Sequence, residues 1–150
     1  MKSRRRHESL IPLSREHHDG LMVCLRIHRG LPLNHSDETW VREKATEITR
    51  FFATHLEPHF KAEEEALFPA MRDVAEASEL VSELLSEHRM LEALGKRLCG
   101  TAGGQLAQAL GEFADLLETH IRKEERELFP LYELRVSAIS KHAFAVEVIR

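Results

Sequence analysis

Apolar residues recur every three to four positions along most of this 150-residue chain, which is the spacing of amphipathic helices. Four stretches carry the pattern, and they cover about residues 14–29, 36–69, 75–98 and 105–133. No stretch shows the strict alternation that is typical of a half-buried strand. Four amphipathic helices joined by short connections predict an all-α, up-down-up-down four-helix bundle. We expect a single domain over residues 1–150, with its core at about 13–133 and a short C-terminal extension.

Capping residues, glycines and prolines predict where these helices begin and end. Ser14 is expected to cap the first helix, and the glycine and proline within residues 30–34 are expected to break it. Asp37 is expected at the start of the second helix. Pro58 lies inside that helix and should kink it, because proline lacks a backbone donor and its ring clashes with the preceding turn. The tail at 135–150 has a poor pattern and could form a short fifth helix.

Composition and charge exclude several classes of partner. The chain is 43% hydrophobic and 31% charged with a formal net charge of −4, which gives no reason to expect nucleic acid or an anionic membrane. No apolar run approaches the ~20 residues of a membrane span, and no signal-peptide pattern is present. Cys24 and Cys99 lie in helical patterns and are expected to be buried free thiols. We therefore expect a cytoplasmic protein, and no feature of the sequence indicates its oligomeric state.

Two copies of one motif combine a histidine with a glutamate four residues later. HFKAEEEALFP begins at His59, and HIRKEERELFP begins at His120. A single pair of this kind is usually a surface pair that contributes a few tenths of a kcal/mol. Here His59, Glu63, His120 and Glu124 fall on apolar stripes, where no Lys or Arg is suitably placed. A buried carboxylate beside a buried imidazole costs several kcal/mol unless a cation compensates it, so we predict that these residues bind metal.

Histidines on the other two helices complete the predicted site. The first helix offers His17 and His18 side by side, and the third helix offers His88. We prefer His18 as the ligand because Leu21 and Leu25 follow it at +3 and +7. His17, which has Leu21 four residues later, remains the alternative. In an antiparallel bundle, donors at one level of all four helices converge near the axis.

The spacing and the type of these ligands indicate which metals suit the site. Residues four apart stand one above the other on a helix, so a histidine can bind one ion while its glutamate bridges to a second. Imidazole and carboxylate without a thiolate favour iron or manganese over a structural zinc site. Because only neutral imidazole binds a metal ion, the metal affinity should weaken below about pH 6.

Four segments together resemble the hemerythrin family, and specifically its HHE cation-binding branch. They are REHHDGL, HFKAEEEALFP, SEHRML and HIRKEERELFP, and the resemblance covers most of the chain. It implies a four-helix bundle that holds two iron ions in a non-haem di-iron centre. Glu63 and Glu124 would bridge the two ions, together with an oxo or hydroxo group. His59 and the first-helix histidine would bind one iron, and His88 and His120 the other.

The resemblance also implies a function. It indicates a protein that binds dioxygen or another small ligand, such as nitric oxide or peroxide, for sensing, storage or detoxification. An iron or redox sensor, an iron donor, and a peroxidase or nitric oxide reductase on the same centre are the alternatives, so enzymatic activity stays open.

Two departures from the respiratory hemerythrins argue against simple oxygen transport. On the third helix, those proteins have a second histidine four residues after the first, and this chain has Glu92 at that position. Either Glu92 is an extra ligand or one iron has an open coordination position, and we prefer the open position. On the fourth helix, Glu124 follows His120 by four residues, whereas in the oxygen carriers an aspartate follows the histidine by five residues.

Other polar residues near the motifs carry less specific expectations. His55, one turn before His59, either orients a ligand or a bound water or is simply a partly buried polar residue. Four further glutamates are expected on solvated faces, where their charge would favour cation uptake, and these are Glu64, Glu65, Glu125 and Glu127.

Overall fold

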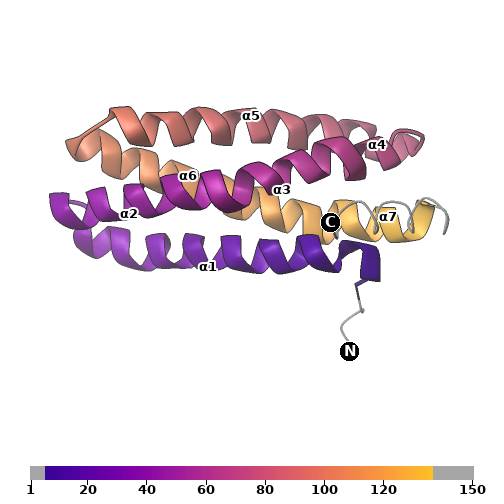
Figure 1. Ribbon diagram of the computed structural model, residues 1–150, viewed down its shortest axis with the longest axis horizontal. Helices are drawn as coiled ribbons and strands as arrows, with labels where there is room; N and C mark the ends of the chain where they lie inside the picture. Colours follow the sequence, from indigo (N-terminus) through magenta and orange to yellow (C-terminus); the bar gives the residue numbers. More distant parts are fainter. Residues whose placement is uncertain (1–5, 137–150) are drawn as a thin grey trace.

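The computed structural model describes residues 6–136, and these are almost entirely helical. Four long helical runs lie along one another in Figure 1, and the described residues contain no strand. The all-α prediction is therefore confirmed, and the arrangement is that of a four-helix bundle. None of the helices in this part of the chain is long and apolar enough to cross a membrane. The expected C-terminal extension lies mostly outside the described residues.

Two of the runs are single α-helices, and the other two include π-helical turns. The first run is α1 (Ile11–Asn34), which follows the 3-10 turn η1 (Glu8–Leu10). The second run consists of α2 (Glu38–Phe51), the π-turn η2 (Phe52–Leu56), α3 (Glu57–Ala62), the π-turn η3 (Glu63–Leu67) and α4 (Phe68–Ala70). The third run is α5 (Ser78–Gly100), preceded by the 3-10 turn η4 (Ala75–Ala77). The fourth run consists of α6 (Gly103–Lys123), the π-turn η5 (Glu124–Leu128) and α7 (Phe129–Arg135).

Short connections bring the runs side by side. In Figure 1 the connections from α1 to α2 and from α5 to α6 lie at one end of the molecule, and the connection from α4 to α5 lies at the other. Helix α6 packs against both α1 and α5, and α2 contacts α1, α5 and α6. Every run therefore faces a common interior.

The first helix is longer than predicted at both ends. It begins at Ile11, so Ser14 lies inside the first turns and is not the cap. The break predicted within 30–34 is wrong, because α1 continues to Asn34. The ring of Trp40 from α2 lies so close to Gly30 that an added Cβ would overlap it, so this glycine allows a close approach of two helices. The second helix begins as predicted, since the Asp37 side chain accepts a hydrogen bond from the Trp40 amide at 3.1 Å.

Each of the three π-helical turns ends two residues before a proline. Proline cannot donate to the carbonyl four residues back, and its ring would collide with that carbonyl. The wider π-turn uses bonds between residues five apart, such as that from the Phe68 amide to the Glu63 carbonyl. At Pro58, where a kink was predicted, the chain has the π-turn η2, which ends at Leu56. Pro69 and Pro130 follow η3 and η5 in the same way.

Two apolar clusters fill the bundle, one on each side of a polar layer. One cluster includes Leu91 and Phe113, and the other includes Leu67, Leu128 and Tyr132. Along each of the four runs, the buried histidines and glutamates lie at the boundary between residues of the two clusters. The hydrophobic packing therefore fixes the depth at which the polar side chains meet.

The two cysteines differ in exposure. Cys24 is buried in α1, and burial raises the pKa of its thiol to about 12. Cys99 near the end of α5 is exposed, so the expectation of two buried thiols is wrong for Cys99. Both thiols are free.

Candidate metal centre

Six polar side chains meet inside the bundle, and each of the four runs contributes to them. None is more than 4% exposed. They are His17 from α1, His59 from α3, Glu63 from η3, His88 from α5, His120 from α6 and Glu124 from η5. Because residues four apart share one helix face, each glutamate points to the same level of the bundle as the histidine that precedes it.

The preference for His18 over His17 is corrected by the structure. His17 lies in the cluster, whereas the neighbouring His18 is exposed to solvent. Adjacent helix residues point about 100° apart, so only one of the two can face the bundle axis. Leu25, seven residues after His18, was expected to mark the inner face of α1, but it is 37% exposed. Its neighbour Cys24 is the buried residue. Cys24 lies seven residues after His17 and therefore marks the true inner face of α1.

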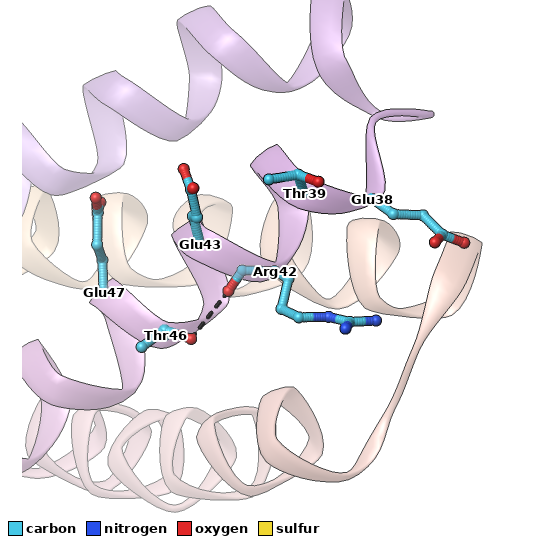
Figure 2. A pocket seen from close by; sticks show the side chains of 6 residues that line it. All are labelled: Glu38, Thr39, Arg42, Glu43, Thr46 and Glu47. Atoms are coloured by element: carbon cyan, nitrogen blue, oxygen red, sulfur yellow. Dashed lines mark hydrogen bonds between the residues drawn. The ribbon is translucent and has the colours of Figure 1, made fainter.

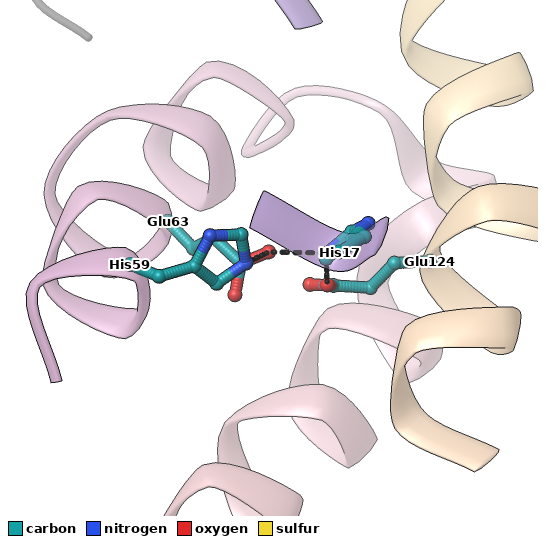
Figure 3. Close-up of side chains that lie close together, drawn as sticks. All are labelled: His17, His59, Glu63 and Glu124. Carbon is teal, nitrogen blue, oxygen red and sulfur yellow. Dashed lines mark hydrogen bonds and ion pairs between the residues drawn. The ribbon is translucent and has the colours of Figure 1, made fainter. Parts of the chain in front are cut away.

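The six side chains form two groups of four that share both glutamates. Within each group, one ligand atom of every residue lies within 4.8 Å of the others, so each group could hold a metal ion. The groups are His17, His59, Glu63 and Glu124, and His88, His120, Glu63 and Glu124. Figure 3 shows the first group, in which dashed lines join the α1 histidine to the carboxylates of η3 and η5.

Each inner carboxylate pairs with a histidine from another run. His17 Nε2 lies 2.8 Å from Glu124 Oε1, and His88 Nε2 lies 2.9 Å from Glu63 Oε1. Four buried atoms have no hydrogen-bond partner among the described residues, and these are His59 Nε2, Glu63 Oε2, His120 Nε2 and Glu124 Oε2. His59 Nε2 and Glu63 Oε2 are 3.1 Å apart, which suits an ion pair but lacks the direction of a hydrogen bond. An unpaired buried polar atom costs about 1–3 kcal/mol, so these four atoms favour a bound cation.

A second layer of four glutamates holds the outer nitrogen of every histidine. His59 Nδ1 lies 2.7 Å from a carboxylate oxygen of Glu16, and His88 Nδ1 lies 2.7 Å from one of Glu64. His120 Nδ1 lies 2.8 Å from Glu87, and His17 Nδ1 lies 2.6 Å from Glu125. A carboxylate can only accept, so Nδ1 carries the proton and Nε2 is the nitrogen that faces the cluster. The contacts close a ring, because the glutamate of each run holds the histidine of the next run and the fourth run holds the first.

This outer layer was missed in the sequence. Glu64 and Glu125 were expected on solvated faces, whereas each is 27% exposed and hydrogen-bonded to a histidine, and Glu16 and Glu87 were given no role at the site. The signal that could have found the layer is adjacency, because every outer glutamate is next in sequence to an inner residue. These neighbours are Glu16 and His17, Glu63 and Glu64, Glu87 and His88, and Glu124 and Glu125.

Basic side chains outside the ring pair with three of its four glutamates. The ion pairs join Arg6 to Glu125 at 3.3 Å, Lys123 to Glu87 at 2.6 Å, and Arg89 to Glu64. Glu16 is different, since its side chain is 46% exposed and, within residues 6–136, it pairs with His59 but with no lysine or arginine. The Arg6 and Lys123 pairs are partly buried, whereas Arg89 is 56% exposed, so the Arg89 pair is the surface pair that contributes little stability.

The pKa values show how the metal-free cluster balances its charge. Burial alone lowers the pKa of an imidazole, but the surrounding carboxylates outweigh it and raise the pKa of His59 to about 9. For the same reasons the pKa of His17 lies well above its ordinary value, and that of His88 is raised. Burial raises the pKa of Glu63, but the three histidines beside it bring that pKa well below its usual range. Burial and the charge of Glu63 raise the pKa of Glu124.

Comparison with known families agrees with this arrangement. The family model described as "Hemerythrin HHE cation binding domain" matches residues 10–132, which is most of the chain. The chain belongs to this family. All six inner side chains and all four outer glutamates of the HHE domain lie within the matched residues. Comparisons with curated proteins and with solved structures gave no match.

Two further residues of the HHE domain lie away from the cluster. Glu92 is part of neither four-residue group and pairs with Arg89 at 3.6 Å. The structure therefore does not place it as an extra ligand. His55 is exposed, its Nδ1 lies 2.7 Å from the Thr54 hydroxyl, and its ring stacks on that of Phe51.

A small, largely enclosed cavity lies directly beside the cluster. Its volume is about 10 Å³, which is the space of roughly one water-sized molecule. His17, His59 and His120 line its inner side, and apolar side chains form most of the remaining wall, among them Leu56 and Leu117. The HHE domain thus has room for one small molecule beside His59 and His120.

A wider hollow on the surface lacks such features. Figure 2 shows its lining, which comes from α2 alone and includes Glu38, Arg42, Glu43 and Glu47. The hydrogen bond from the Thr46 hydroxyl to the Arg42 carbonyl stays within that helix. No second element contributes a lining residue, so we assign no site to this hollow.

Proposed function

We propose that this HHE domain binds two iron ions at the buried cluster and that the resulting centre binds dioxygen or a related small ligand, such as nitric oxide or peroxide. Glu63 and Glu124 would bridge the ions, His17 and His59 would bind one of them, and His88 and His120 the other. We propose sensing, storage or detoxification of the small ligand as its role.

The four unpaired buried atoms support metal binding most strongly. A metal-free polar core would be expected to pair its buried atoms with one another, because each unpaired atom costs free energy. Here they belong to two imidazoles, whose Nδ1 atoms are already held by outer glutamates, and to two carboxylates, whose other oxygens already pair with His88 and His17. Imidazole and carboxylate together suit non-haem iron, and no cysteine belongs to either group.

The protein residues would prepare the site in three ways. The outer glutamates keep the proton of each histidine on Nδ1, so that Nε2 can donate its lone pair inward. The two apolar clusters exclude water and thereby strengthen the electrostatic interactions in the centre. The enclosed cavity limits the ligand to about one small molecule. Iron, when bound, would supply reversible electron transfer and open coordination positions.

Metal content and ligand spectra would test the proposal directly. Protein purified without oxygen and loaded with iron(II) should contain about two irons per chain, and its absorption spectrum should change on adding oxygen, nitric oxide or peroxide. Fully folded protein that cannot be loaded with iron would refute the proposal. Sustained turnover of peroxide or nitric oxide would identify an enzyme, and a large loss of helicity on chelation would indicate a metal sensor.

A pair of matched variants would identify the ligands. Glu63→Ala should remove most of the bound iron, because it removes a carboxylate shared by both groups. Glu65→Ala is the control, since Glu65 lies in the same π-turn but is exposed. Equal iron contents in the two variants would exclude Glu63 as a ligand.

A reducing compartment suits the two free thiols, one of which is exposed. We therefore propose the cytoplasm as the site of function.

A further inference from the structure

Two separate hollows share a wall made of Phe51 and His55. The inner one is the small cavity beside the cluster, which lies against His59 and His120. The outer one is a surface hollow of about 310 Å³ between α1 and the second run. Its lining residues are Val23, Arg26, Ile27, Lys44, Glu47, Ile48, Arg50, Phe51, Thr54 and His55. Only Phe51 and His55 belong to both linings.

The shared wall is a pair of stacked rings. The ring centroids of Phe51 and His55 lie 4.8 Å apart, and the planes are inclined by 13°. Phe51 is the last residue of α2, and His55 lies within the π-turn η2. The imidazole is exposed on its outer side, where Nδ1 pairs with the Thr54 hydroxyl at 2.7 Å. Neither ring is fixed by a buried polar partner among the described residues.

The other sides of the cluster are closed more firmly. The two apolar clusters cover it above and below along the bundle axis. Between the runs, the outer glutamates span from helix to helix, and three of them are paired with bases. Among the residues that line the inner cavity, Glu16 and His55 are exposed to solvent, and of these two only His55, stacked on Phe51, also lines the outer hollow.

We propose that the Phe51–His55 pair is the gate through which a small ligand passes between solvent and the cluster. This inference rests on the proposed function and adds the entry route to it. Rotation of either side chain about its χ1 angle joins the two hollows without any movement of the helices, and such rotations are fast. The apolar inner wall, which includes Leu56, Leu117 and Ile121, favours small uncharged molecules.

Stopped-flow binding of nitric oxide to the reduced, iron-loaded protein would test the gate. In Phe51→Ala and His55→Ala, the association and dissociation rate constants should both rise by the same factor, on the order of tenfold. The dissociation constant and the iron content should not change, because a gate alters the barrier and not the bound state. Phe51→Trp should slow both rates.

Phe52→Ala provides a matched control for the loss of an aromatic side chain. Phe52 is the next residue along the chain and is also partly buried, but it packs on Phe60, Phe113 and Gly95 and does not line the inner cavity. Its nitric oxide rates should match those of the unmodified protein. Unchanged rates in both alanine variants of the pair, or a change in the dissociation rate alone, would overturn the proposed gate.

A second measurement separates the gate from the metal. In metal-free protein, dissolved dioxygen should enhance the NMR relaxation of the Leu117 and Ile121 methyl protons, which lie at the cavity. The enhancement should increase in Phe51→Ala and decrease in Phe51→Trp. If the unmodified protein takes up no iron, the proposed function fails, while this experiment still decides the entry route. Equal enhancement in all three proteins would overturn the gate even if iron binds as proposed.

Discussion

Raising the pH from about 6.5 to about 9 should strengthen metal binding to this HHE domain while it destabilises the metal-free fold. In the metal-free protein the carboxylates around His59 raise its pKa to about 9, from an ordinary value of 6.5. His17 and His88 are shifted in the same direction. His59 is therefore an imidazolium at neutral pH, and a metal ion must displace its second proton to bind.

The size of the effect follows from the pKa of His59. The difference between 6.5 and about 9 corresponds to about 3 kcal/mol, at about 1.36 kcal/mol per pKa unit. Because the folded-state pKa is the higher one, this contribution to the stability of the metal-free fold is fully present below about pH 6.5. It is lost as the pH rises through about 9. Over the same window the metal affinity should rise by up to about tenfold per pH unit for each proton displaced.

Two measurements would check this prediction. Calorimetric titration with iron(II) at pH 7, in buffers that differ in ionisation enthalpy, should reveal the release of about one to three protons per chain. Chelator competition between pH 6.5 and 9 should give the rising affinity, and urea unfolding of the metal-free protein should give the falling stability. His28→Gln should leave both slopes unchanged, since the ion pairs described for His28 are with Asp115 and Glu118, neither of which belongs to the cluster. A metal affinity that is independent of pH over this window would refute the reasoning.

Two substitutions test the support of the site and the packing of the helices. Glu87→Gln keeps an acceptor for His120 Nδ1 but removes the negative charge of the carboxylate. Metal affinity measured by chelator competition should therefore fall roughly 10- to 100-fold. An unchanged affinity would mean that the outer glutamates do not tune the ligands. Gly30→Ala should destabilise the fold by about 1 kcal/mol in urea unfolding, because overlap with Trp40 (about 1–3 kcal/mol) exceeds the gain in helix propensity (about 1 kcal/mol). Gly100→Ala, with no atom within 4 Å of the added Cβ, should cause no loss, and equal stabilities of the two variants would contradict the packing argument.

The helices and most of the inner cluster could be predicted because each rests on a local pattern. Apolar spacing identifies a helix and its inner face, and a histidine or carboxylate on that face stands out against it. His59, Glu63, His120 and Glu124 occupy such positions, and the structure brings their side chains together. His88 lies there for the same reason, between residues of the two apolar clusters.

The remaining features depend on how the helices pack against one another, and the spacing of apolar residues along the sequence does not reveal this packing. To choose between His17 and His18, the rotation of α1 about its own axis must be known to better than 100°. Leu25 is apolar but exposed, so its position pointed to the wrong histidine. Gly30 lies inside α1, where the adjacent Trp40 uses the space that a glycine leaves. The π-turns arise from a proline within a helix that packing keeps continuous, and helix periodicity alone does not reveal them.

The ring of outer glutamates couples the formation of the centre to the packing of the whole bundle. Glu16 and His17 are neighbours, so one rotation of α1 sets both an inner side chain and the support of His59 on the second run. The same holds for Glu87 and His88, which face His120 and the cluster, respectively. A rotation of any one run therefore disturbs its own inner residue and the histidine of the next run together. Because the ring closes, the four runs must reach their native orientation jointly, and we expect urea unfolding of the iron-loaded protein to release the iron and the tertiary structure in one cooperative step.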